Sequence, residues 1–156
     1  MAERITDLIN EDDVLVPLQS TSKEDLLSEL TGFLVKRLGR EDLTDTVLEG
    51  VWEREREMST GIGRGIAIPH AEIDEKIPPS AVIGISPSGA EFDALDSQPV
   101  HIVFLLICSK HNQDVRLGIL SSLSYLFGER SVRQALRKAA SPKEVVEIIR
   151  ESEGKQ

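Results

Sequence analysis

The sequence predicts an α/β protein in which helices cover a mixed central sheet. Short apolar runs of strand length alternate along the chain with longer segments whose apolar residues recur at helical spacing. The helical segments lie before, between and after the predicted strands, which favours a layered α/β architecture over an all-helical or all-strand one. With 156 residues, the chain is expected to form a single domain, residues 1–156.

The N-terminal part is expected to contain one strand and two helices. A strand is predicted near 14–18, and Thr21-Ser-Lys-Glu24 has the pattern of a capping box that opens a helix over 21–36. Gly39 follows the last apolar residue of this helix and is expected to end it. A second amphipathic helix is predicted from about Asp42 to Glu55.

The middle of the chain is expected to supply the rest of the sheet. A glycine-rich turn at 59–65 leads to a short apolar strand at 66–68, which Pro69 closes. Further strands are predicted at 81–85 and 100–108. The second of these is apolar enough to be central and buried on both faces.

The C-terminal part is expected to be helical. Ser86-Pro-Ser-Gly-Ala90, between the last two strands, has the composition of a turn. Helices are predicted at about 113–127 and again after Gly128. A last helix is expected to open at Ser141-Pro-Lys-Glu144, which combines an N-cap serine with a proline at the first helical position.

Composition narrows the classes of partner. Hydrophobic residues make up 40% of the chain and charged residues 29%, and the net charge is −9. An acidic surface repels nucleic-acid phosphates and anionic lipid, so we expect protein partners and no nucleic acid. No apolar run has the length of a signal peptide core or a membrane span, so a cytoplasmic location without membrane insertion is expected. Cys108, the single cysteine, is expected to be a small buried apolar residue.

The three histidines do not form a metal-binding pattern. No two nitrogen, sulfur or carboxylate ligands recur near them at close spacing, so neither a metal nor a cofactor is expected. His101 alternates with Val100 and Ile102 in a predicted strand and is expected to be structural. His111 precedes a predicted helix, where a polar loop residue is the first expectation and anion binding the alternative.

The three glycines at 61, 63 and 65 do not predict a nucleotide-binding loop. Their spacing matches neither the dinucleotide pattern nor the phosphate loop, which ends in Lys followed by Ser or Thr. No helix can follow directly, because Pro69 comes too soon. A structural turn is therefore the simpler interpretation.

His70 has the most suggestive chemical setting. It follows the predicted strand 66–68 and is expected at a strand end, where α/β proteins place reacting groups. A neutral imidazole is a nucleophile whose phosphoryl adduct is labile enough to be passed on. Arg54, Arg56 and Arg64 offer cations, and the glycine turn offers amide donors, for a phosphoryl group. Without further information, such a histidine is equally compatible with an ordinary surface residue.

A longer motif favours the reactive role. Gly61-Ile-Gly-Arg-Gly-Ile-Ala-Ile-Pro-His-Ala71, together with Ser59-Thr60 before it, resembles the active-site signature of the enzyme IIA domains of the fructose, mannitol and nitrogen-regulatory phosphotransferase class. Similarity extends over nearly the whole chain, through Ile5–Ile9, the segment Glu53-Arg-Glu55 and Phe92–Val100. The resemblance implies a mixed sheet of about five strands with helices on both sides.

The resemblance also implies a function. In such domains the histidine, here His70, accepts phosphate from the small carrier HPr or its nitrogen-branch counterpart. The phosphate then passes to a cysteine of enzyme IIB or serves as a regulatory mark, so the chain would be a phosphotransferase component. A separate domain of this length resembles the nitrogen-regulatory branch more than the sugar-transport branch. The alternative is a regulatory protein that binds its target according to phosphorylation, with little onward transfer.

Two arginines complete the implied catalytic set. Arg54 corresponds to the arginine expected to contact the phosphoryl oxygens. Arg116 occupies the place where many relatives have a second histidine, and it can donate two hydrogen bonds but cannot titrate. A loop shift that returns His111 to this place is the alternative.

The partner is expected to dock on a largely apolar surface around His70. Glu72, Asp74 and Glu75 supply acidic charges at the rim that would steer a basic partner toward it.

Overall fold

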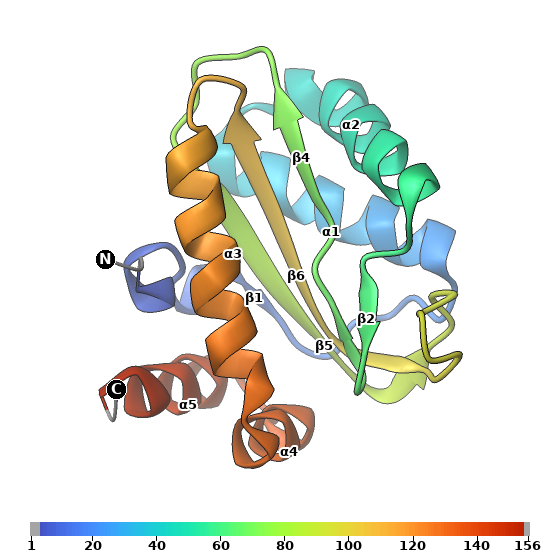
Figure 1. Ribbon diagram of the computed structural model, residues 1–156, viewed down its shortest axis with the longest axis vertical. Coiled ribbons are helices and arrows are strands. Elements are labelled where there is room, and N and C mark those ends of the chain that lie inside the picture. The colour runs from blue at the N-terminus through green and yellow to red at the C-terminus, as the bar shows by residue number, and fades with distance from the viewer. Residues whose placement is uncertain (1–3, 155–156) are drawn as a thin grey trace.

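A mixed sheet lies between two helical layers in the computed structural model, which describes residues 4–154 (Figure 1). The strands are β1 (Val14–Leu15), β2 (Gly61–Gly63), β3 (Ile66–Ala67), β4 (His70–Ile73), β5 (Ser80–Ala90) and β6 (Val100–Ser109). Their order is β1-β5-β6-β3-β2, with β4 also paired to β6. The expected mixed sheet is confirmed, with six strands instead of about five.

The central strand β6 organises this sheet. It runs antiparallel to β5 and parallel to both β3 and β4. Strands β3 and β4 keep one register against β6, since Ala67 lies opposite Val103 and His70 lies opposite Leu106. They behave as one strand that is interrupted at residues 68–69, which explains why the count exceeds five.

Five α-helices cover the two faces. They are α1 (Lys23–Leu38), α2 (Thr44–Glu57), α3 (Gln113–Gly128), α4 (Arg130–Lys138) and α5 (Pro142–Gly154). Short 3-10 turns lie at Ile5–Asp7, Glu11–Asp13 and Glu41–Leu43. In Figure 1, α3 crosses in front of the sheet while α1 runs behind it. Among residues 4–154, no helix combines the length and apolar character needed to cross a membrane.

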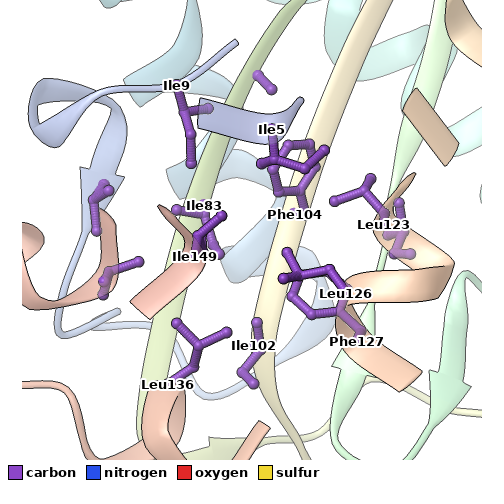
Figure 2. Close-up of a cluster of buried hydrophobic side chains, with 14 of the residues drawn as sticks. Ile5, Ile9, Ile83, Ile102, Phe104, Leu123, Leu126, Phe127, Leu136 and Ile149 are labelled. Carbon is purple, nitrogen blue, oxygen red and sulfur yellow. The ribbon is translucent and has the colours of Figure 1, made fainter. Parts of the chain in front are cut away.

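Alternation along β6 divides the buried residues into two clusters. Ile102, Phe104 and Leu106 pack with α3, α4 and α5 in the cluster drawn in Figure 2. Val103 and Leu105, on the opposite face, pack with α1 and α2. Because every side chain from Ile102 to Cys108 is buried, β6 is the doubly covered strand that its apolar run predicts.

The helix ends lie within about two residues of the sequence prediction, and one N-cap differs. Gly39 ends α1 in the left-handed region, with φ of 67°, as expected. The N-cap of α1 is Ser22, whose Oγ accepts the amide N–H of Asp25 at 3.2 Å, so the capping box predicted one residue earlier is wrong. At the last helix, Ser141 Oγ accepts the amide N–H of Glu144 at 3.2 Å, as expected.

Two strands differ from the prediction. β1 stops at Leu15, because Pro17 has no amide N–H to continue the ladder. β5 continues through 86–90, where we expected a turn. The pairing is irregular there, because Ile85 lies opposite Ile102 whereas Ala90 lies opposite Val100. The turn-forming residues therefore produce a bulge within the strand and not its end.

The two ends of the described chain are joined by a buried carboxylate. Glu153 in α5 accepts the backbone N–H of Ile5 and, at 2.6 Å, the hydroxyl of Thr6. Glu153 is only 8% exposed, so these bonds are largely shielded from water. The N-terminal turn is thereby held against the helical layer of α3 and α5.

Truncating the core on β6 is expected to cost much more stability than truncating the surface. We expect Phe104→Ala to lower the free energy of unfolding by about 3–5 kcal/mol, because Phe104 is fully buried. Tyr125→Ala is the matched control, since Tyr125 is 60% exposed, and it should change that free energy by less than about 0.5 kcal/mol. Urea denaturation measures both, and equal losses would contradict the assignment of the core.

Candidate functional site

Strand β4 places His70 on the α3 side of the sheet. Side chains alternate along this strand, so Ala71 and Ile73 are buried in the cluster under α1 and α2, while His70 and Glu72 are half-buried on the other face. His70 opens β4 and pairs with the interior of β6. His70 follows the end of β3, as expected, but it does not lie outside the sheet, because the chain resumes strand pairing directly after Pro69.

A pocket of about 300 Å³ lies beside His70. Its walls come from three elements that are distant in sequence. Helix α2 contributes Arg54, strand β4 contributes His70 and Glu72, and helix α3 contributes Arg116. The structure thus brings the three predicted site residues to one pocket, and Glu72 lies there with them.

One hydrogen bond fixes the proton on the His70 ring. Nδ1 lies 2.8 Å from the carbonyl oxygen of Ile68, and a carbonyl can only accept. Nδ1 therefore carries the hydrogen, and the lone pair of the neutral ring is on Nε2. Nε2 is consequently the nitrogen of His70 that could act as a nucleophile.

The surroundings of His70 favour its neutral form. Burial lowers the pKa of the imidazole below its ordinary value, and the positive charges of Arg54 and Arg116 lower this pKa further. The hydrogen bond to Ile68 and the charge of Glu55 act in the opposite direction without reversing the shift. At neutral pH the ring is therefore unprotonated at Nε2 and available as a nucleophile.

The two guanidinium groups of the pocket are held differently. Arg54 donates from Nη1 to the carbonyl oxygen of Met58 at 2.7 Å, which ties it to the end of its own helix. Arg116 forms an ion pair with Glu72, with 3.0 Å between Nη2 and Oε1. The Nε of Arg116 is buried and has no hydrogen-bond partner among residues 4–154. Arg116 therefore has donor capacity left for an anion in the pocket.

A buried carboxylate that the sequence did not single out positions the backbone under His70. Glu55 is 5% exposed and accepts from Thr60 twice, from the amide N–H at 2.8 Å and from the hydroxyl at 2.6 Å. Its charge is paired with Lys23, at 2.9 Å. The carbonyl of Thr60 accepts the N–H of Ile68, whose own carbonyl accepts from His70. The only sequence signal for Glu55 was its place in the segment Glu53-Arg-Glu55.

Two other predicted contributors do not reach the pocket. Arg64 lies at a separate pocket, and Arg56 is exposed and absent from the walls around His70. The expected amide donors of the glycine turn are also wrong for this site, since the N–H of Gly61 donates to Ser59 Oγ and that of Arg64 to Asp96. These residues form the hairpin of β2 and β3, which points away from His70 along the sheet.

The other two histidines and the cysteine lie outside the pocket around His70. His111 is exposed and does not line the pocket, whereas Arg116 does. Both ring nitrogens of His101 are partnered, Nδ1 by the Ser86 carbonyl at 2.9 Å and Nε2 by Arg137 at 3.0 Å, as expected for a structural histidine. Cys108 is buried, and burial raises the pKa of its thiol to about 11, which makes it a poor nucleophile. Among residues 4–154, no group of three His, Cys, Asp or Glu could hold a metal ion.

The lowered pKa of His70 can be measured by following its ring protons by NMR during a pH titration. We expect a pKa below 6.5, and Arg54→Ala should raise this pKa because a neighbouring positive charge is lost. As pH falls, His70 is protonated in the unfolded chain before it is protonated in the folded protein. This difference lowers the free energy of unfolding below about pH 6.5 and does not change it at higher pH. Arg150→Ala removes an exposed arginine of α5 and should leave the pKa unchanged. A His70 pKa above 6.5 would contradict this description of the site.

Comparisons with known proteins agree with this geometry. A family model described as "Phosphoenolpyruvate-dependent sugar phosphotransferase system, EIIA 2" matches residues 7–152. The fructose-specific EIIABC component of Bacillus subtilis is 34% identical over 146 residues, which are 94% of this chain. This chain spans only 23% of that longer relative. The nitrogen regulatory protein of Klebsiella oxytoca is 30% identical over 152 residues, covering 97% of this chain and 93% of the relative.

Solved structures have the same fold. The nitrogen regulatory protein IIA-Ntr of Neisseria meningitidis matches with a TM-score of 0.86 and 26% identity, covering 94% of this chain and 99% of that one. Enzyme IIAMtl of Escherichia coli, in its complex with phosphorylated enzyme IIBMtl, matches with a TM-score of 0.75 and 19% identity, covering 92% of this chain and 97% of that one. The chain belongs to the EIIA 2 family of the phosphoenolpyruvate-dependent sugar phosphotransferase system.

Proposed function

We propose that this protein is a histidine phosphoryl carrier, with the phosphoryl group on Nε2 of His70. The observation that carries the proposal is the fixed ring of His70, whose nucleophilic nitrogen lies in a pocket with two guanidinium groups. Membership of a phosphotransferase family supports the same general chemistry. The exchange would take place in the cytoplasm, with other phosphocarrier proteins.

The proposed transfer is an exchange between nitrogen atoms. Nε2 of neutral His70 attacks the phosphorus of a phosphohistidine on an HPr-like carrier. The new N–P bond forms as the N–P bond of the carrier breaks, and the electron pair of that bond returns to the carrier's imidazole. The product on His70 is a phospho-imidazolium, whose positive charge the Ile68 carbonyl stabilises at Nδ1–H. Onward transfer to a thiolate of enzyme IIB forms an S–P bond and restores neutral His70.

Arg54 and Arg116 would neutralise the phosphoryl oxygens during this exchange. Arg54 is already held at the pocket by the Met58 carbonyl. Arg116 would release Glu72 when the stronger dianion arrives and turn its guanidinium group to the phosphoryl oxygens. Glu72 is therefore a competitor for Arg116 within the site and not only a rim charge that steers partners.

The partners would dock around the pocket through apolar side chains. Met58 is 58% exposed, and its carbonyl oxygen accepts the hydrogen bond from Arg54. Leu117 is 57% exposed and follows Arg116 in the sequence. Contiguous exposed apolar patches mark docking surfaces, and these two side chains would be the apolar part of the proposed one. We infer an HPr-like donor, and an enzyme IIB acceptor like that in the complex of the structurally similar IIAMtl.

A regulatory role is the second candidate. In this role the protein would bind a target protein according to its phosphorylation, with little onward transfer. The similarity to the Klebsiella oxytoca nitrogen regulatory protein over 93% of that protein favours this branch. Arg116 favours it as well, because a permanently charged arginine stabilises a bound phosphoryl group instead of releasing it.

Phosphorylation can be tested with labelled phosphoenolpyruvate, enzyme I and an HPr-like carrier. We expect label on the wild-type protein and none on His70→Ala, because the acceptor nitrogen is lost. His111→Ala is the matched histidine control and should retain full labelling, since His111 is outside the pocket. Arg54→Ala should be labelled at least about tenfold more slowly and remain folded. Unlabelled wild-type protein would contradict both candidate roles, since each needs phosphate on His70, whereas labelled protein that passes no phosphate to an enzyme IIB would favour the regulatory role.

The role of Arg116 can be tested against its ion-pair partner. Arg116→Ala is expected to slow labelling at least about tenfold and shorten the lifetime of the phospho-form, because one cation is lost. Glu72→Gln should act in the opposite direction, because it frees Arg116 for the phosphoryl group. Quench-flow labelling and decay of the isolated phospho-protein measure the two quantities. Wild-type values in both variants would place Arg116 outside the transfer site.

A further inference from the structure

A second pocket, of about 420 Å³, lies near the start of β6, away from His70. His101 lines it near the start of β6, whereas His70 pairs with Leu106, about 16 Å further along the strand at 3.3 Å per residue. The proposed transfer makes no use of this pocket. Its walls carry four arginines, Arg64 of the β2–β3 turn and Arg130, Arg133 and Arg137 of α4.

The positive charge of these four arginines is not neutralised by ion pairs. Within the described part of the chain, none of them has a carboxylate oxygen within 4.0 Å of its guanidinium, although the net charge of the protein is −9. Asp96 is the one acidic side chain in the wall, and its carboxylate accepts the backbone N–H groups of Arg64 and Gln98, each at 3.0 Å. The wall therefore has a clear excess of positive charge.

Neutral acceptors hold two of the arginines in place. Arg133 donates from Nη1 to the carbonyl oxygens of Phe127 and Gly128, at 2.8 and 3.0 Å. Arg137 donates from Nη2 to Nε2 of His101 at 3.0 Å. Because these acceptors carry no charge, the bonds order the guanidinium groups without neutralising them. Ordered cations lose less entropy when an anion binds, so the pocket is preorganised.

The backbone beneath His101 is shaped to fit the ring. Gly65 and Gly89 both have positive φ, of 80° and 89°. A Cβ on Gly89 would lie 3.0 Å from the His101 ring, and one on Gly65 would lie 3.5 Å from it. A side chain on Gly89 would therefore crowd the ring, whereas a Cβ on Gly65 would make only ordinary contact with it, and both positions have a backbone conformation that favours glycine. The third glycine of the motif, Gly65, thus contributes to this pocket and not to the one around His70.

The arrangement of arginines on α4 also favours an anion. Arg130, Arg133 and Arg137 recur every three or four residues, so they lie on one face of the helix. Like charges at this spacing repel each other and destabilise a helix unless an anion lies between them. Arg130 is also the first residue of α4, and so the partial positive charge of the helix N-terminus adds to the same field.

We propose that this pocket binds a small anion with two or more linked phosphate groups, as in pyrophosphate or a nucleoside diphosphate. The planar guanidinium fork matches phosphate oxygens, and several arginines from two elements can each take a separate oxygen. The volume is that of a small-molecule site. Such a ligand would link the protein to the phosphorylated metabolites of its surroundings, independently of the phosphoryl group on His70.

Calorimetric titration with inorganic pyrophosphate at low salt tests the proposal. The titrated protein carries Arg54→Ala and Arg116→Ala, so that the pocket around His70 cannot supply the binding. We expect saturable binding of one pyrophosphate per chain. Adding Arg130→Gln and Arg137→Gln should weaken it at least about tenfold, by loss of two charge-assisted contacts. Adding Arg150→Gln removes an exposed charge of α5 and should leave the affinity within about twofold.

Titrations with other anions and NMR mapping of the bound site complete the test. Orthophosphate and sulfate should bind at least about tenfold more weakly than pyrophosphate, since each has only one anionic group. Amide shifts on binding should be centred on Gly65 and Gln134, both of which line the pocket. If ADP binds as tightly as pyrophosphate, the phosphate groups alone are recognised. If ADP binds more tightly, the protein also contacts the nucleoside. No saturable binding, equal affinity for sulfate, or no effect of the two α4 substitutions would overturn the proposal.

Discussion

The geometry around His70 depends on the buried carboxylate of Glu55. Both carboxylate oxygens are occupied, one by Lys23 and the amide of Thr60 and the other by the Thr60 hydroxyl. A buried charge is costly unless it is paired and hydrogen-bonded in this way, so the segment around Thr60 has little freedom. Thr60 then fixes Ile68, and Ile68 fixes the His70 ring. The imidazole ring of His70 is thus oriented by a charge that does not contact it.

Local patterns predicted the elements of the fold better than their connections. Helical periodicity located the helices to within about two residues, because each repeat reflects which face of the helix is buried. The long apolar run likewise identified β6 as the doubly buried strand. The resumption of pairing after Pro69 and the continuation of β5 through 86–90 were missed. Both depend on the register imposed by β6, a non-local property that composition does not encode.

For the site as well, local sequence patterns identified the residues but not all the contacts between them. His70, Arg54 and Arg116 were identified from the motif and its resemblance, and all three line one pocket. Arg64 was assigned to the wrong place, because it lies in the turn of the β2–β3 hairpin and the extended strand β3 separates it from His70. The ion pair of Glu72 with Arg116 could not be anticipated, since it joins a strand to a helix packed on the sheet. Such contacts exist only after the layers have assembled.

The hydrogen bonds between Glu153 and the N-terminal turn affect how such a domain can be joined to others in larger proteins. Because residues 5 and 153 are in contact, both ends of the folded unit leave from the same side of the molecule (Figure 1). A module fused ahead of the unit and one fused behind it would therefore start from nearly the same position. Domain order in a longer polypeptide, such as the Bacillus subtilis relative, could then be rearranged by evolution without redirecting the tethered modules.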